Sequence, residues 1–132
     1  MDAATRTIVR DRAEGRCEYC HLPELATPFI PFHVEHVIAQ QHLGSDDPEN
    51  LALACDRCNA FKGQNLSSVD PVSKAIVQLF HPRFDVWDEH FVMDDAIIIG
   101  RTAKGRATAR LLTMNAPRRV QLRSEWIFGS ED

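Results

Sequence analysis

Two short stretches decide the fold: residues 17–20 read Cys-Glu-Tyr-Cys, and residues 55–58 read Cys-Asp-Arg-Cys. Two residues between the cysteines of a pair let both sulfur atoms point at one ion, and two such pairs complete the four-sulfur tetrahedron that Zn²⁺ prefers. Because four thiolates close the coordination shell, we expect this zinc to stabilise the fold rather than to take part in a reaction. The 34 residues between the pairs exceed the insert of a compact zinc ribbon, so a small folded unit must bring the pairs together. The predicted zinc ligands are Cys17, Cys20, Cys55 and Cys58.

The composition is that of one modest globular domain. Among 132 residues, 44% are hydrophobic, which suits a small core that a structural metal would help to stabilise. No run of about 18 apolar residues is present, and residues 1–16 lack an apolar signal segment, so we expect no membrane contact and a cytoplasmic location. In a reducing compartment, paired cysteines hold metal more often than they form disulfides. The alternatives are a redox pair, whose usual strand–helix–strand surroundings are missing here, and unrelated buried cysteines.

The charge is divided unevenly along the chain. The formal net charge is −4, yet residues 1–95 carry 8 Lys and Arg against 16 Asp and Glu, and residues 96–124 carry 7 Lys and Arg and no acidic residue. Such a basic segment can bind phosphate groups although the whole chain is acidic. We therefore expect Arg106 and Arg110, which lie on one predicted helix, to contact nucleic acid. The alternative is a solvated helical face.

Hydrophobic periodicity predicts short helices and strands in the first half of the chain. We expect a helix over residues 3–14, a strand over 32–38, a second strand over 51–54 and a short helix through 59–62. A polar turn over residues 44–50 separates the two strands.

In the second half, one segment fits two structures. Residues 69–80 suit either a helix or a turn followed by an extended stretch, and β-branched and aromatic residues before Pro82 favour the extended form. The remaining predictions are a β-hairpin of residues 86–93 and 96–99, a helix over 102–114 and a short helix around 120–127.

The region between and just after the cysteine pairs contains the residue types that can cut a phosphodiester. Such a reaction needs a base that activates water, and a cation that stabilises the charge on the phosphate and on the leaving oxygen. Residues 32–38 read Phe-His-Val-Glu-His-Val-Ile, and residues 50–63 read Asn-Leu-Ala-Leu-Ala-Cys-Asp-Arg-Cys-Asn-Ala-Phe-Lys-Gly. Histidine suits the base because its pKa lies near neutrality, and hard oxygen ligands suit Mg²⁺ or Mn²⁺.

This order of residues closely resembles the HNH endonuclease family, in its four-cysteine, zinc-stabilised branch. The resemblance covers residues 17–63 and implies a ββα-metal core, which agrees with the strand–loop–strand–helix order predicted above. It also implies a metal-dependent endonuclease that hydrolyses phosphodiester bonds of DNA, expected to be double-stranded, with structural zinc and catalytic magnesium or manganese. The predicted fold class is thus α+β: residues 1–66 form the nuclease core with an N-terminal helix, and residues 67–132 form a hairpin-plus-helix extension packed on it, as one domain overall.

The resemblance also implies a role for each matching residue. Glu35 takes the place of an acidic metal ligand, which is Asp in many members, and His36 takes the place of the general base. Asn50 takes the place of the amide that braces the loop and orients the histidine, and Asn59 that of the second metal ligand. Lys62 matches a basic position that contacts phosphate.

Each of these roles has a structural alternative. Glu35 fits a surface strand residue, His36 a half-buried histidine, the two asparagines turn caps, and Lys62 a solvated helical lysine. Adjacent residues on a flat strand point to opposite faces, so Glu35 and His36 share one site only where the strand twists or ends. For the whole chain, the competing hypothesis is a non-catalytic zinc-knuckle module that binds nucleic acid or protein.

Overall fold

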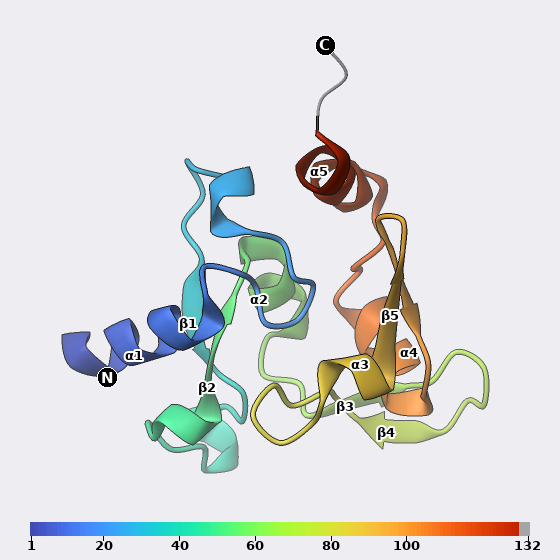
Figure 1. Cartoon of the computed structure of the whole chain (residues 1–132). Coiled ribbons are helices and arrows are strands. Elements are labelled where there is room, and N and C mark those ends of the chain that lie inside the picture. The colour runs from blue at the N-terminus through green and yellow to red at the C-terminus, as the bar shows by residue number, and fades with distance from the viewer. Residues whose placement is uncertain (130–132) are drawn as a thin grey trace.

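Three two-stranded antiparallel sheets, joined by short helices, make up the part of the chain that the structure describes, residues 1–129. This computed structural model places the first sheet and its helices beside a second group of elements, which contains the other two sheets (Figure 1). The last helix, α5 (Pro117–Phe128), lies above the second group in this view and contacts the turn Glu24–Ala26 of the first group.

The first sheet and the helix that follows it form a strand–strand–helix unit. Strand β1 (His33–His36) pairs antiparallel with β2 (Leu51–Ala54), all of whose residues are buried. Helix α2 (Asp56–Lys62) begins directly after β2, because the Cys55 sulfur accepts a hydrogen bond from the Cys58 N–H and caps the first turn. This is the order of elements in a ββα-metal core, and the predicted α+β fold class is confirmed.

Helix α1 (Ala3–Ala13) packs on the first sheet through the buried side chain of Val9. The Asp2 carboxylate accepts a hydrogen bond from the Thr5 N–H at 2.8 Å and so caps the helix. The helix ends where Glu14 adopts a left-handed conformation, so the predicted helix over residues 3–14 is confirmed to within one residue.

The second group contains two hairpins, β3 with β4 and β5 with β6, and α4 packs against three of these four strands (Figure 1). The bounds are Ser67–Val69 for β3, Ile76–Gln78 for β4, Trp87–His90 for α3, Phe91–Asp94 for β5, Ile97–Gly100 for β6 and Ala103–Leu111 for α4. Three 3₁₀ turns, Glu24–Ala26, Gln40–His42 and Pro48–Asn50, lie in the loops of the first group.

One hydrophobic core is shared by both groups. The ring of Phe80 packs edge-to-face against Tyr19 of the first group, with 6.4 Å between centroids, and against Phe91 of the second, with 5.2 Å. The two halves of the described chain thus meet in one core. The division of the chain at residue 66, into residues 1–66 and 67–132, stays a prediction. Residues 130–132 lie outside the described part. No helix within that part is both long and apolar enough to cross a membrane.

The ambiguous segment 69–80 forms a turn followed by strand β4, as the extended interpretation predicted. The Asp70 carboxylate fixes the turn by accepting hydrogen bonds from the N–H groups of Val72 and Ser73, both at 3.1 Å. Asparagine and aspartate side chains favour turns in this way because they satisfy backbone donors two or three residues on.

The predicted strand over residues 86–93 is too long. Residues 87–90 form the single helical turn α3, and only β5 continues as a strand. The Trp87 indole donates a hydrogen bond to the Tyr19 carbonyl at 2.8 Å, and its ring stacks on His21. Both contacts join segments far apart in the sequence, so local propensity does not reveal them. Helices α4 and α5 confirm the last two predicted helices, with ends shifted by three residues at Leu111 and Pro117.

Candidate active site and zinc centre

The four cysteine sulfurs lie together in the core. All are within 4.8 Å of one another, every one of the four residues is buried, and the Cys20 and Cys55 sulfurs are 3.7 Å apart. Zn–S bonds of about 2.3 Å in a tetrahedron place neighbouring sulfurs roughly 3.8 Å apart, so the cluster has the size and the chemistry of a zinc site. The four residues that the sequence predicted as zinc ligands are therefore placed to hold a metal ion.

Both cysteine pairs lie in turns that direct backbone N–H groups at sulfur. The Cys20 N–H donates to the Cys17 sulfur at 3.5 Å, and the Cys58 N–H donates to the Cys55 sulfur at 3.4 Å. Burial raises the pKa of the Cys17 and Cys58 thiols well above their ordinary value. A cation bound among the four sulfurs would stabilise them as thiolates.

A hollow of about 440 Å³ lies beside the zinc centre, between β1, the loop that follows it, and α2. Glu35, His36 and Asn59 all line this hollow, so the structure brings together the three residues that the HNH resemblance assigned to metal binding and base catalysis. Strand β1 ends at His36, which is where adjacent side chains can turn toward one site. The full lining is His33, Val34, Glu35, His36, Ala39, Gln40, Gln41, Asn59, Gly63 and Gln64.

The Glu35 carboxylate is buried between two donors. One oxygen accepts a hydrogen bond from the Tyr19 hydroxyl, and the other accepts one from the Lys62 ammonium at 3.2 Å. Burial raises the pKa of Glu35 above its ordinary value, although Lys62 and Tyr19 oppose this effect. Burial also raises the pKa of Tyr19, so its hydroxyl keeps the proton that it donates. Tyr19 lies inside the first cysteine pair, and sequence reasoning gave it no role.

The environment of Lys62 differs from the one expected of a lysine that contacts phosphate. Its side chain is only 2% exposed, and the ammonium donates to the carbonyls of Val37 at 2.8 Å and His36 at 3.3 Å besides Glu35. An ammonium has three donors, and these three oxygens use all of them. Lys62 therefore ties the end of β1 to α2 and has no free donor for a phosphate in this arrangement.

His36 has one partner that the sequence did not indicate. Its Nε2 lies 2.6 Å from the Asp46 carboxylate, in the loop that follows β1. The hydrogen bond to His36 lowers the pKa of Asp46, so this carboxyl group is ionised at neutral pH. Ten residues separate the two in the chain, and no motif connects them.

Asn50 joins the end of β1 to the loop that carries Asp46. Its side-chain oxygen accepts from the Ile38 N–H at 2.9 Å, and its amide donates to the Ile38 carbonyl at 3.0 Å and the Ser45 carbonyl at 2.8 Å. The loop passes so close that a Cβ atom at Gly44 would lie 1.6 Å from the Ile38 oxygen. The loop that carries the partner of His36 is therefore fixed by one buried amide and one glycine.

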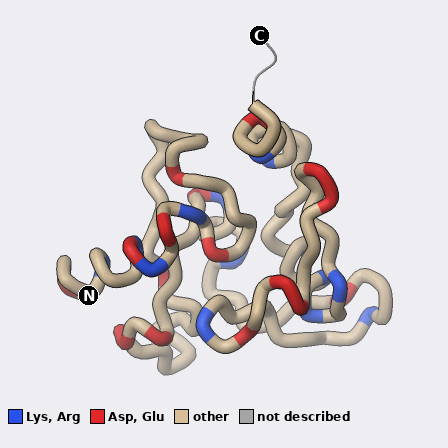
Figure 2. Tube along the Cα trace, viewed as in Figure 1, with Lys and Arg blue, Asp and Glu red and all other residues tan. Residues whose placement is uncertain are grey.

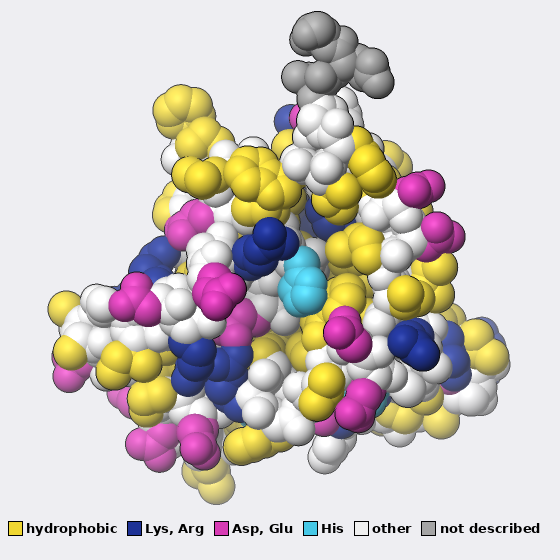
Figure 3. Space-filling view, viewed as in Figure 1, with side chains coloured by type: hydrophobic (Ala, Val, Ile, Leu, Met, Phe, Trp, Pro, Cys, Tyr) yellow, Lys and Arg dark blue, Asp and Glu magenta, His cyan; other side chains and the backbone are white. Residues whose placement is uncertain are grey.

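Two residues of the basic segment are paired with carboxylates in the fold. Arg106 forms a two-pronged ion pair with buried Asp70, at 2.9 Å for both nitrogens, and Lys104 pairs with Asp85 at 3.0 Å. Arg110 remains exposed. Acidic and basic residues lie among one another in space in Figure 2, and they are interspersed on the face drawn in Figure 3. The predicted nucleic-acid contact at Arg106 conflicts with this pairing, whereas Arg110 is free to make one.

Together, the strand–strand–helix unit, the four-cysteine cluster and the hollow define a ββα-metal fold with a four-cysteine site that can hold a metal ion. Residues 17–65, a little over a third of the chain, match the family model described as HNH endonuclease. Comparison with curated proteins and with solved structures gave no match.

Proposed function

We propose that the chain is a metal-dependent endonuclease that hydrolyses phosphodiester bonds of DNA. The observation that carries the proposal is the shared hollow: a carboxylate, an imidazole and an amide from Glu35, His36 and Asn59 line one cavity within the segment that matches the HNH family. Nuclease chemistry requires a proton acceptor and hard oxygen ligands in one place, and this cavity supplies both types.

Glu35 and Asn59 would hold the divalent cation, magnesium or manganese. An ionised carboxylate has about four positions that accept a bond, and the two hydrogen bonds of Glu35 leave further positions available. A cation held there would stabilise the charge on the phosphate and on the leaving oxygen. Because one carboxylate and one amide are weak ligands for such a cation, we expect its affinity to depend on oxygens that the nucleic acid supplies.

His36 would take the proton from the attacking water. Its Nε2 faces an ionised carboxylate, Asp46, which favours the tautomer that carries the proton on Nε2. In that tautomer Nδ1 is the nitrogen with a free lone pair, and it is the atom that would accept the proton. Asn50, through its bonds to Ile38 and Ser45, would keep the strand end and the Asp46 loop in register. By analogy with the family, the products would carry a 5′-phosphate and a 3′-hydroxyl.

The test is cleavage of supercoiled plasmid DNA with Mg²⁺ or Mn²⁺, with and without a chelator. The variant His36→Ala is expected to lower the cleavage rate by about 100-fold or more, because that is the contribution of a positioned general base. His42→Ala is the matched control, since His42 is exposed in the same loop region and does not line the hollow. Zinc content and melting temperature should match the unaltered protein in both variants, and undiminished cleavage by His36→Ala would contradict the proposal.

One observation favours a second candidate function, a non-catalytic zinc-knuckle module that binds nucleic acid or protein. Both oxygens of Glu35 are engaged and the side chain is only 6% exposed, as expected of a carboxylate that only stabilises the fold. The same assay separates the two functions. If the protein retards the migration of DNA in a gel but does not cleave it with any divalent metal, the result would support the binding module.

A further inference from the structure

We propose that helix α5 completes the zinc centre: Arg119 balances the charge of the four-thiolate site and Arg123 holds the helix in place, so that zinc retention depends on the docking of this helix. Four thiolates and one Zn²⁺ carry an excess of two negative charges, and the centre is buried. A buried charge is stable only when it is paired, so the core must supply positive partners. This inference is independent of the proposed nuclease activity.

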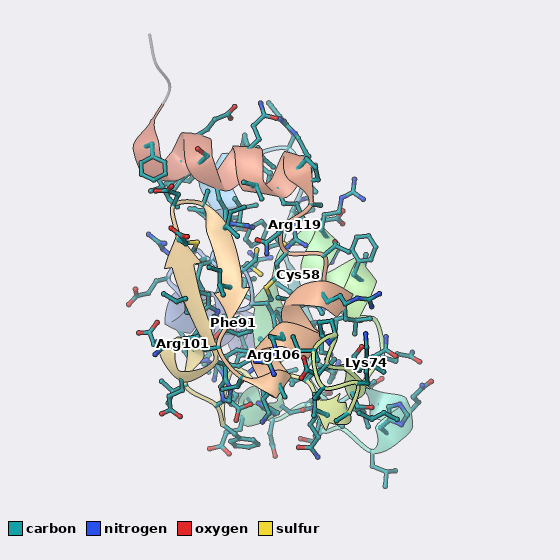
Figure 4. The ribbon with its side chains drawn as sticks, turned by 90° about the vertical axis from the view of Figure 1, so that its right-hand side faces the viewer. Cys58, Lys74, Phe91, Arg101, Arg106 and Arg119 are labelled. Atoms are coloured by element: carbon teal, nitrogen blue, oxygen red, sulfur yellow. The ribbon has the colours of Figure 1, made fainter. Side chains whose placement is uncertain are left out.

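Arg119 touches the sulfurs directly. Its Nη2 lies 2.8 Å from the Cys58 sulfur and 3.5 Å from the Cys55 sulfur, and its Nη1 donates to the Leu112 carbonyl at the end of α4. Figure 4 shows Arg119 reaching from below α5 toward Cys58. The planar guanidinium thus bridges the second cysteine pair and the terminus of a helix more than 50 residues away in the chain.

Arg123 lies one helical turn further on, on the same face of α5. Its Nε donates to the Ala96 carbonyl at 3.0 Å, and its Nη2 donates to the Asn115 side-chain oxygen at 3.2 Å. Asn115 in turn bonds both the N–H and the carbonyl of Ile98, in strand β6. Arg123 therefore connects α5 to the β5–β6 hairpin.

Among the described residues, the cysteine sulfurs are the anionic partners that Arg119 contacts. Arg119 is 5% exposed and Arg123 is 2% exposed, and within residues 1–129 neither pairs with a carboxylate. The Nη1 of Arg123 is buried and has no hydrogen-bond partner among the described residues. Burying the Arg119 guanidinium without the thiolates beside it would be strongly unfavourable.

Hydrogen bonds from Arg119 would make the sulfurs poorer nucleophiles and slow their release of zinc. Outer partners of metal ligands typically change metal affinity by roughly 10- to 100-fold. We therefore expect Arg119→Met, which keeps most of the side-chain volume but loses the charge, to release zinc roughly 10- to 100-fold faster to an excess of a chromogenic chelator. Arg118→Met is the matched control, because the neighbouring Arg118 is exposed and bonds only to Gln121 on its own helix.

Cobalt substitution gives a readout that a purely structural role of Arg119 would leave unchanged. A hydrogen bond to a thiolate lowers the energy of its lone pair, so loss of the bond should move the sulfur-to-cobalt charge-transfer band to longer wavelength. Arg119→Lys keeps the charge but loses the planar guanidinium with its paired donors. Its band position and its zinc-release rate should lie between those of the unaltered protein and those of Arg119→Met. It also serves as the test if Arg119→Met does not fold. A folded variant, either Met or Lys, with the unaltered band and the unaltered zinc-release rate would overturn the proposal.

Discussion

Glu35 illustrates how one side chain can serve both the fold and a site. It lies between the hydroxyl of Tyr19 and the ammonium of Lys62, yet it also lines the hollow that His36 faces. Tyr19 belongs to the turn that carries two zinc ligands, and Lys62 is the last residue of α2. The position of this carboxylate is therefore set by the zinc turn on one side and by the helix on the other.

We predict that Tyr19→Phe weakens both stability and cleavage without loss of zinc. A hydrogen bond to a charged group contributes about 1.5 to 3 kcal/mol, and the substitution leaves one oxygen of a buried carboxylate without its donor. Urea denaturation should show a fall of that size in the free energy of unfolding, and plasmid cleavage should slow. Zinc content, measured on the same sample, is the control. Unaltered stability together with unaltered cleavage would show that the hydroxyl does not hold Glu35.

Residues that belong to a spaced motif were predictable from the sequence, and their partners were not. The cysteine pairs and the adjacent Glu35 and His36 can be recognised in the sequence from their spacing and residue types. Tyr19 and Asp46 carry no such signal, because 16 and 10 residues separate them from Glu35 and His36, and only the fold brings them together. The prediction that Lys62 contacts phosphate did not foresee that the Lys62 side chain is buried, because only the fold brings its partners close.

At the scale of elements, the sequence predicted a helix or strand correctly where the residues of that element itself determine its ends. Asp2 caps α1, and the apolar run of β2 matches a strand that is buried throughout. The helical turn α3 was not predicted because Trp87 contacts Tyr19 and His21, which lie in a distant part of the chain. The distribution of charge along the chain was misleading in the same way, since Lys104 and Arg106 of α4 pair with acidic residues from earlier in the chain.

The Asp70–Arg106 pair should make stability depend on acid pH. Arg106 lowers the pKa of Asp70 below its ordinary value, so the pair contributes stability above the unfolded pKa, near pH 4, and loses it as the pH falls further. We predict that the melting temperature of Asp70→Asn lies below that of the unaltered protein above about pH 5, and that the gap narrows below about pH 4. Asp47→Asn, on an exposed loop, is the control. A gap that stays constant down to about pH 2 would exclude this ion pair as the cause.

At the scale of the whole molecule, the shared core and the arginines of α5 join the two halves. Phe80 contacts rings from both groups, and Arg119 joins α5 to the cysteines. The division at residue 66 therefore does not correspond to a boundary between separate cores. Sequence patterning indicated one domain but gave no sign that the last helix reaches the zinc centre.

We predict that loss of zinc unfolds both halves in one transition. Cys55→Ser removes a ligand, and metal binding at such a site is coupled to folding. Far-ultraviolet circular dichroism and the fluorescence of Trp87 and Trp126, one in α3 and one in α5, should therefore change together when the unaltered protein is treated with a chelator. Asp56→Asn, beside the same ligand on an exposed position, is the control for the variant. A Trp126 signal that survives chelation would show that the C-terminal half folds without the metal.

The place of Tyr19 between two sulfur ligands has a consequence for the response of the protein to peroxide. An oxidant that attacks either thiolate of the first pair would expel the ion and release the turn, and the phenol would then withdraw from Glu35. We expect the proposed nuclease activity to be lost under oxidative stress while Glu35, His36 and Asn59 stay chemically unaltered, and to be recovered once a reductant and Zn²⁺ are supplied.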